Sequence, residues 1–326
     1  MRCVIAPGDG TIRVEDRPIP QPGPDEVRVR VHGAGLNRAD LLQRQGFYPA
    51  PPGLPADIPG LEFAGVVDAC GPKVQSPSVG DRVFGVTGGG AQAEHVIVPA
   101  THCAAVPANL ELVDAGGVPE VFVTAHDAMR TRARLQPGEH VLVHAVGSGV
   151  GTAVVQLAKA FGCTVTGTAR TQSKLDDARA LGMDHGILAP RDLEPLAFSQ
   201  EIAANGGAPD VVIDLVGGAY VTAEVAAIAP RGRIVIVGTL AGGMPAVPLL
   251  GLMQKRAEMH GTVLRPRSVA DKAAAIAAFV DEVVPMLADG RVRPVVDRVF
   301  SIDDADAAYA RLETDATFGK LILDAS

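Results

Sequence analysis

The sequence has no tryptophan, three tyrosines and four cysteines among its 326 residues. The cysteines Cys3, Cys70, Cys103 and Cys163 lie far apart and form no C-x-x-C pair of the kind that binds a metal or acts as a redox couple. A basic surplus is also lacking, since the formal net charge is -8 at pH 7 and the pI is near 5.5. This balance argues against a nucleic-acid partner, because binding along phosphates needs clustered Lys and Arg.

Long hydrophobic runs are absent as well. No apolar stretch approaches the roughly 18–20 residues that cross a bilayer, and the first residues enter a strand-like pattern without the apolar core of a signal peptide. We therefore expect a cytoplasmic protein with no membrane partner. What is present, 47% hydrophobic and 20% charged residues, is typical of a globular protein. The length predicts two domains, because single domains usually have about 100–200 residues.

The first hundred residues have the pattern of short strands separated by Pro and Gly. Residues 27–31 alternate apolar and charged side chains, the period of a half-buried strand, and residues 63–67 and 94–98 are similar. One helix is predicted in this region, over residues 38–45. These features indicate a compact, β-rich domain with tight turns.

The pattern changes near residue 140, where short apolar runs alternate with segments of helical spacing. The apolar runs are residues 140–145, 164–169, 184–188, 209–216, 233–239 and 259–264. Such alternation predicts an α/β fold with a Rossmann doubly wound parallel sheet of six strands, covered by helices on both faces. The last part of the chain predicts a long helix over residues 268–287 and a final strand, residues 320–323, that returns to the first domain.

A glycine-rich turn follows the first of these apolar runs. Gly147, Gly149 and Gly151 lack the Cβ atoms that would keep a pyrophosphate from the backbone, and the helix that follows offers unpaired N–H groups. Strand, glycine turn and helix together predict a dinucleotide site, although Val146 and Ser148 occupy two positions where the usual fingerprint has glycine. The residues expected at the pyrophosphate are Ser148, Gly149, Val150 and Gly151.

The end of the second apolar run predicts which cofactor is used. An NAD site has an acidic residue there, which binds the adenosine ribose. In this chain the first carboxylate after residues 164–169 is Asp176, inside the next predicted helix. Arg170, Thr171 and Lys174 are instead suited to surround a 2′-phosphate. This favours NADPH. The alternative is that Arg170 and Lys174 are only solvated charges at a helix start.

Nine short motifs resemble those of one known family. They are residues 36–40, 43–48, 60–62, 80–83, 88–93, 119–120, 148–152, 214–218 and 318–320. Together they are similar to the zinc-free quinone oxidoreductases of the medium-chain dehydrogenase/reductase superfamily, in particular the branch with the p53-inducible quinone oxidoreductase, which also has Ser at the Ser148 position. The resemblance implies a GroES-like β-barrel domain from residues 1–122 and 265–326, beside a Rossmann domain of residues 123–264.

The resemblance also implies a reaction without metal. Zinc alcohol dehydrogenases of the superfamily have Cys at the position of Asn37 and His at that of Leu61, and neither residue found here can replace such a ligand. Without a Lewis acid, alcohol oxidation is not expected. Reduction of a quinone depends less on a Lewis acid, because the negative charge that hydride transfer creates is delocalised over the quinone ring. We expect NADPH-dependent hydride transfer to a quinone or similar conjugated carbonyl, in the cleft between the domains.

Two residues are expected at the reacting centre. Asn37 is expected to hold the nicotinamide ribose or a substrate oxygen, and Tyr48 to donate to the developing oxyanion. The alternative for Tyr48 is a purely packing role in a proline-rich loop. Arg265 is expected either to face the substrate at the rim of the cleft or to be solvated.

Further cofactor contacts are implied by the resemblance alone. They are Thr124 and Gly217, the stretch Gly238, Thr239 and Leu240, the pair Val263 and Leu264, and Lys320 in the returning tail. The branch often has a Tyr near the adenosine phosphate where this chain has Ala189, which weakens the case for NADPH unless Arg191 compensates.

Two other functions compete with quinone reduction. One is an enoyl-thioester reductase, in which a Tyr near the Tyr48 position protonates the product carbon. The other is a protein that binds NADPH with weak catalysis. Residues 238–261 resemble the region that joins subunits in the family, so a homodimer is expected.

Overall fold

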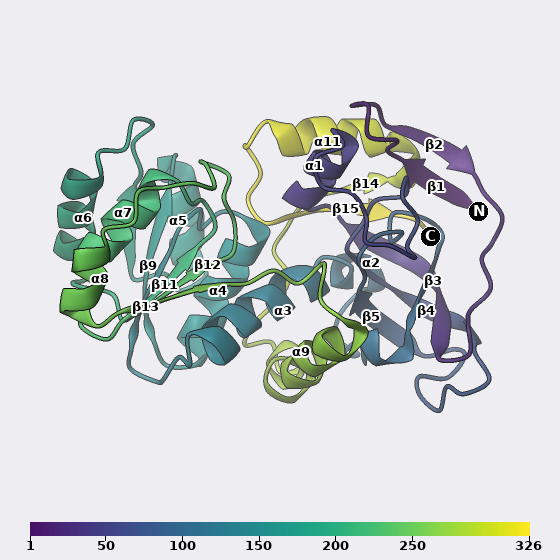
Figure 1. Ribbon diagram of the computed structural model, residues 1–326. Coiled ribbons are helices and arrows are strands. Elements are labelled where there is room, and N and C mark those ends of the chain that lie inside the picture. The colour runs from purple at the N-terminus through teal and green to yellow at the C-terminus, as the bar shows by residue number, and fades with distance from the viewer. The chain divides into compact units, whose positions relative to one another are not determined.

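The computed structural model describes all 326 residues, which form two units (Figure 1). Unit 1 comprises Met1–Val123 and Leu264–Ser326, and unit 2 comprises Thr124–Val263. The helix α3 (Pro119–His126) carries the chain from the first unit to the second. No helix of the chain is long and apolar enough to cross a membrane.

Unit 1 is built on a seven-stranded sheet, with most strands antiparallel. Its strands follow the order β14-β15-β3-β4-β5-β7, and β6 pairs with β3. Their bounds are β3 (Glu26–Gly35), β4 (Glu62–Cys70), β5 (Arg82–Val86), β6 (His95–Pro99), β7 (Cys103–Ala105), β14 (Val296–Ser301) and β15 (Lys320–Asp324). The pairing of β15 with β3, Ile322 opposite Gly35, confirms that the final strand returns to the first domain. A separate hairpin consists of β1 (Arg2–Ile5) and β2 (Arg13–Asp16).

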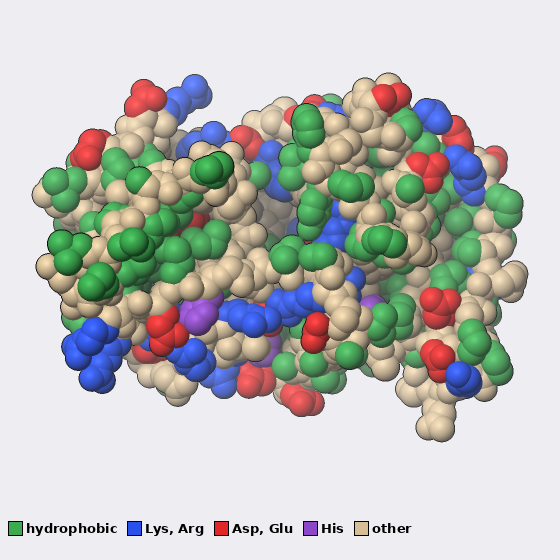
Figure 2. Space-filling model, in the orientation of Figure 1, with side chains coloured by type: hydrophobic (Ala, Val, Ile, Leu, Met, Phe, Trp, Pro, Cys, Tyr) green, Lys and Arg blue, Asp and Glu red, His purple; other side chains and the backbone are tan.

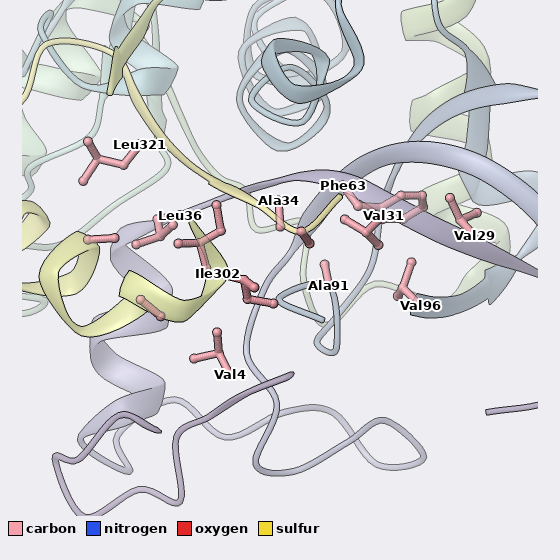
Figure 3. Packing of buried hydrophobic residues seen from close by; sticks show 14 of the residues in the cluster. Val4, Val29, Val31, Ala34, Leu36, Phe63, Ala91, Val96, Ile302 and Leu321 are labelled. Atoms are coloured by element: carbon pink, nitrogen blue, oxygen red, sulfur yellow. The ribbon is translucent and has the colours of Figure 1, made fainter. Parts of the chain in front are cut away.

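The core of unit 1 consists mainly of small aliphatic side chains. Val29 and Val31 of β3 are fully buried, whereas Arg30 between them is exposed, which is the predicted alternation. Figure 3 shows these valines with Phe63, Val96 and others of the same cluster. The helices around this core are α1 (Arg38–Arg44), α2 (Leu112–Ala115), α9 (Val269–Glu282), α10 (Val284–Ala288) and α11 (Ala305–Glu313).

The long helix predicted over residues 268–287 is wrong in one respect, because it is two helices. α9 ends at Glu282 and α10 begins at Val284, with Pro285 in its first turn. Proline has no N–H to continue the ladder of the preceding helix, and its ring collides with that helix's last carbonyls. The break lies where proline is tolerated, at a helix start.

Unit 2 confirms the Rossmann prediction. Its six strands are all parallel and follow the order β10-β9-β8-β11-β12-β13. Their bounds are β8 (His140–Val143), β9 (Thr164–Ala169), β10 (His185–Leu188), β11 (Val211–Asp214), β12 (Arg233–Ile236) and β13 (Glu258–Gly261). β8 and β11 are buried throughout, as central strands covered on both faces must be.

The helices of unit 2 surround this sheet (Figure 1). They are α4 (Gly149–Ala160), α5 (Gln172–Ala180), α6 (Pro195–Ala204), α7 (Ala219–Ala227) and α8 (Leu249–Lys255). Phe198 and Ile202 anchor α6 in the core. Because β8, β9, β11 and β12 run parallel, their carboxyl ends meet at one edge, where a nucleotide binds in such folds.

Candidate active site

The turn after β8 leaves two backbone donors for an anion. Ser148 caps α4, and its Oγ accepts a hydrogen bond from the Gly151 amide at 3.1 Å. The amides of Gly149 and Val150 have no acceptor in the protein, as expected for the first turn of a helix. These N–H groups and the positive end of the 12-residue helix favour a bound phosphate. This cradle fits the pyrophosphate of a dinucleotide.

Gly151 has no room for a side chain. A Cβ atom there would lie 2.5 Å from the carbonyl oxygen of Ala145 and 2.7 Å from that of Val146. Both are backbone atoms of the same turn, so they cannot move aside cheaply. Glycine therefore lets the helix start pack directly on the end of the strand.

A second turn, after β11, brings three of the expected cofactor residues together. Gly217 has φ +70°, and a Cβ there would lie 3.0 Å from the Cα of Thr239 and 3.3 Å from the carbonyl oxygen of Gly238. Asp214 fixes this turn, since its carboxylate accepts hydrogen bonds from the amides of Val216 at 2.7 Å and Gly217 at 2.9 Å. Gly217, Gly238 and Thr239 thus share the carboxyl edge of the sheet.

The residues expected at a 2′-phosphate follow β9 at the same edge. Arg170 and Thr171 are exposed and Lys174 is half-buried. The first carboxylate, Asp176, is engaged on α5 itself, 2.9 Å from the amide of Gln172 and 2.6 Å from the guanidinium of Arg179. The segment therefore presents two cations and a hydroxyl, a donor set that fits a phosphate.

Sequence reasoning missed a buried titratable group under these turns. His144, just after β8, lies with Nδ1 3.0 Å from Thr168 Oγ1 and Nε2 3.1 Å from Glu224 Oε1, the latter without good hydrogen-bond geometry. Both His144 and Glu224 are fully buried. Burial lowers the pKa of His144 to about 4 and raises the pKa of Glu224 to about 8, so the pair is neutral near pH 7. No local signal exists, because 80 residues separate the two.

Unit 1 carries a second polar cluster, centred on Asn37. The Lys320 ammonium pairs with Glu62 Oε1 at 2.6 Å, and it also donates to Asn37 Oδ1 at 2.8 Å and to the carbonyl of Leu36. The Asn37 amide donates to Glu62 Oε1 at 3.0 Å. Glu62 and Lys320 are 0% and 4% exposed. Lys320 therefore positions Asn37 and Glu62, and its expected contact with the cofactor stays a prediction.

Asp40 fixes the start of α1 behind this cluster. Its carboxylate accepts from the backbone amide of Asn37 at 2.8 Å and from Gln92 Nε2 at 3.1 Å. Gln92 Oε1 in turn accepts from the buried hydroxyl of Tyr309 at 2.8 Å. Burial raises the pKa of Asp40 to about 6. The chain of contacts locks the backbone of Asn37 in place.

Arg265 does not face solvent, so the expectation of a solvated arginine was wrong, whereas its expected contact with substrate stays a prediction. It is 3% exposed and donates to the carbonyls of Gly88 at 2.8 Å and Tyr48 at 2.9 Å, and to Gln43 Oε1 at 2.5 Å. Its guanidinium carbon lies 4.6 Å from the centre of the Tyr48 ring. The stacked cation holds this ring in one orientation.

Tyr48 itself retains an unused polar group. Its hydroxyl forms no hydrogen bond within the protein, while its backbone carbonyl is held by Arg265. Burial raises the pKa of this hydroxyl, so it is a phenol and a donor at neutral pH. The role in donating to an oxyanion stays a prediction that this geometry suits.

Glu120 joins the Asn37 cluster although sequence reasoning gave it no role. Its backbone amide donates to Glu62 Oε2 at 2.9 Å. Burial, and after it the charge of Glu62, raises the pKa of Glu120 to about 8. The residue lay within the Pro119-Glu120 motif of the resemblance, which was the only available signal.

The donor set of the cluster does not fit zinc. Asn37 and the buried Leu61 offer neither a thiolate nor an imidazole, and no group of three or more His, Cys, Asp or Glu side chains is placed to hold a metal. Four-coordinate zinc needs such a set. No step is therefore assigned to a metal ion.

The remaining expected residues lie apart from these clusters. Thr124 is half-buried on α3 at the start of unit 2, and Leu240 is exposed after β12. Val263, the last residue of unit 2, is 50% exposed, whereas Leu264, the first residue of the second segment of unit 1, is buried. Their contacts with a cofactor stay predictions.

Comparison with family models identifies the class of protein. Residues 23–108 match the alcohol dehydrogenase GroES-like domain and residues 149–280 match the zinc-binding dehydrogenase family. A quinone oxidoreductase of Pseudomonas aeruginosa is 32% identical over 323 residues, 97% of this chain and 96% of the relative. The chain belongs to the medium-chain dehydrogenase/reductase superfamily, among its quinone oxidoreductase-like members, and is an oxidoreductase of that superfamily.

Other similar proteins include a much longer protein and two solved structures. A pikromycin polyketide synthase component of Streptomyces venezuelae is 38% identical over 234 residues, which are 72% of this chain but 6% of that protein. Among solved structures, a mycobacterial protein complexed with NADPH has a TM-score of 0.87 and 27% identity, covering 99% of this chain and 100% of its own. The CurK enoyl reductase has a TM-score of 0.85 and 25% identity, covering 99% and 98%.

Proposed function

We propose that this chain is an NADPH-dependent reductase that transfers hydride to a quinone or a similar conjugated carbonyl without a metal ion. The observation that supports it most is the composition of the Asn37 cluster. It offers an amide, an ammonium and carboxyl groups, but no group of three or more His, Cys, Asp or Glu side chains that could hold a metal ion. A site without a metal ion is best suited to a quinone or similar conjugated carbonyl, because the reduced form of such a substrate delocalises its own negative charge.

The edge of the unit 2 sheet supports NADPH as the cofactor. Ser148 and the free amides of Gly149 and Val150 would hold the pyrophosphate, and Arg170 with Lys174 would hold the 2′-phosphate. The solved mycobacterial relative was crystallised with NADPH, which agrees with this choice. When bound, the nicotinamide supplies the hydride.

The residues of unit 1 then have defined tasks. Asn37, held by Glu62 and Lys320, orients the ribose or an acceptor oxygen, and one lone pair of its Oδ1 remains for that contact. Tyr48, fixed by Arg265, directs its hydroxyl to the oxygen on which charge develops. Arg265 and Lys320 act through these two residues.

The test is the oxidation of reduced cofactor, followed at 340 nm. Purified protein is mixed with NADPH or NADH and with either 1,4-benzoquinone or a larger ortho-quinone. The uncatalysed rate is subtracted, and the assay is repeated with a chelator as a control. Rapid, chelator-insensitive oxidation of NADPH, slower with NADH, is the expected result. Tight NADPH binding without turnover on quinones or enones would contradict the proposal and favour a protein that binds NADPH with weak catalysis.

An enoyl-thioester reductase is the second candidate, and the similarity to the CurK enoyl reductase favours it. Tyr48 would then protonate the product carbon instead of donating a hydrogen bond to an oxyanion. The discriminating measurement compares kcat/KM for crotonyl-coenzyme A with that for 1,4-benzoquinone. A thioester value that exceeds the quinone value would replace the first proposal by the second.

We further propose that the chain forms a homodimer through β13 and the segment before it. β13 is an edge strand of the unit 2 sheet, with one side unpaired. Exposed hydrophobic side chains lie nearby, and they gather over α8 in Figure 2; they are Leu240, Met244, Leu249, Leu250 and Met253. Light scattering after size exclusion should give twice the mass of 33.6 kDa, and Leu250→Glu should give the monomer.

A further inference from the structure

The turn that precedes α4 contains a strained residue. Ala145 has φ +50°, a left-handed backbone conformation that a residue with a Cβ atom adopts only where its surroundings enforce it. The carbonyl oxygen of Ala145 accepts from the amide of Ser148 at 2.9 Å, and a Cβ on Gly151 would lie 2.5 Å from it. This conformation therefore shapes the turn that leaves the amides of Gly149 and Val150 for an anion.

Thr168 of β9 holds the chain on both sides of Ala145. Its hydroxyl lies 3.0 Å from Nδ1 of the His144 ring, and its carbonyl accepts from the amide of Val146 at 2.9 Å. The backbone amide of His144 also donates to the carbonyl of Ile213 at 3.2 Å. The residue before Ala145 is thus held through its side chain and its backbone, and the residue after it through its backbone.

The His144 ring is enclosed on its other sides. It is fully buried, and its Nε2 lies 3.1 Å from Glu224 Oε1 of α7. The centre of the ring lies 4.7 Å from that of Tyr220 and 6.1 Å from that of Phe198. Because Thr168 is only 1% exposed, water does not readily replace its hydroxyl when that group is removed.

We propose that Thr168, acting through His144, is a positioning residue that keeps Ala145 left-handed and thereby keeps the pyrophosphate turn ready for a dinucleotide. The inference rests on the cofactor part of the proposed function. Without the hydroxyl contact, Ala145 relaxes to an ordinary backbone conformation in a fraction of the molecules, and only the others bind. The apparent affinity falls by that fraction, although no direct contact with the cofactor is lost.

Two properties distinguish this role from general support of the fold. The pyrophosphate is common to NADPH and NADH, so both should lose affinity equally, whereas a shift of Arg170, two residues after Thr168, would affect NADPH alone. Glycine adopts the left-handed conformation at no steric cost. Ala145→Gly should therefore make the hydroxyl of Thr168 dispensable for binding.

A second buried threonine–histidine pair, toward the amino ends of the same two strands, supplies the control. Thr166 of β9 is 0% exposed, and its hydroxyl lies 2.8 Å from Nε2 of His140, the first residue of β8. The same hydroxyl donates to the carbonyl of Asn205 at 3.0 Å. Thr166→Val thus removes an equally buried hydroxyl from a buried histidine, away from the edge where the cofactor is expected.

The experiment measures the Kd for NADPH and for NADH by the fluorescence of the reduced nicotinamide. Thr168→Val should raise both Kd values by the same factor, about 5- to 30-fold, which is the population penalty of a non-glycine residue in the left-handed region. Thr166→Val should leave both within about 2-fold of wild type. In protein that already carries Ala145→Gly, adding Thr168→Val should also change both by less than about 2-fold.

The other outcomes overturn the inference. A folded Thr168→Val variant with wild-type affinity for both cofactors does so, as does a rise in Kd that Thr166→Val shares, that is confined to NADPH, or that persists with Ala145→Gly. Wild-type protein that binds neither cofactor overturns the proposed cofactor as well, which separates the two failures. Thermal unfolding establishes that each variant folds. If Thr168→Val does not, His144→Phe, which keeps an aromatic ring in place, decides by the same comparisons.

Discussion

Replacing Lys320 with methionine should destabilise unit 1 strongly. The change removes the cation that pairs with Glu62 at 2.6 Å, and Glu62 is 0% exposed. Breaking a buried pair by removing one partner costs about 3–5 kcal/mol. Glu62 keeps two hydrogen bonds, from Asn37 and from the Glu120 amide, so we expect the lower end, about 3 kcal/mol.

Thermal and urea unfolding, followed by circular dichroism, measure this cost. A unit of about 150–250 residues loses roughly 2–4 °C of Tm per kcal/mol, so Lys320→Met should lower the Tm of unit 1 by about 6–12 °C. The double variant Glu62→Gln, Lys320→Met should recover much of it, because no unpaired charge remains. Lys73→Met is the control, since Lys73 pairs with Asp25 on the surface and its loss should cost about 0–1 kcal/mol. A Lys320→Met variant no less stable than the control would refute the reasoning.

Three further predictions concern unit 2. Replacing Arg170 or Lys174 with Gln should raise the Kd for NADPH about 10-fold or more, through loss of charged hydrogen bonds to the phosphate, and leave the Kd for NADH unchanged in fluorescence titrations. Gly151→Ala should cost about 1–3 kcal/mol in urea unfolding and weaken NADPH binding, because its Cβ would lie 2.5 Å from a carbonyl oxygen; unaltered binding would contradict this. Glu224, whose pKa is raised to about 8 in the folded state, contributes stability at acidic pH that is lost as pH rises from about 4.5 to 8. Glu224→Gln should remove that decline in Tm, and an unchanged decline would speak against the raised pKa.

Much of the fold follows from local sequence. The six apolar runs of unit 2 are all strands of one parallel sheet, and the central strands β8 and β11 are buried throughout, so their apolar runs carry a local signal. The glycine turn before α4 has a local steric cause at Gly151. The predicted helix of residues 268–287 failed at Pro285, whose effect on the preceding turn is also local but was overlooked.

The candidate site was less predictable. Lys320 and Glu62 come from strands 258 residues apart, and only the return of β15 beside β3 brings them together. Arg265 is buried by its contacts with the Tyr48 loop, and no nearby pattern in the sequence marks a buried arginine. Glu120 gains its significance from burial beside Glu62, which neither residue reveals in sequence. Local chemistry is visible in a sequence, whereas the environment that tunes it depends on tertiary contacts.

The central claim is metal-free hydride transfer from NADPH to a conjugated carbonyl. Its most direct test is the rate at which chelator-treated protein, checked for metal content, oxidises NADPH and 4-deuterated NADPH with 1,4-benzoquinone. The account predicts full activity without metal and a primary isotope effect on kcat/KM. Activity that disappears with metal removal, or no oxidation of NADPH by folded protein, would contradict it.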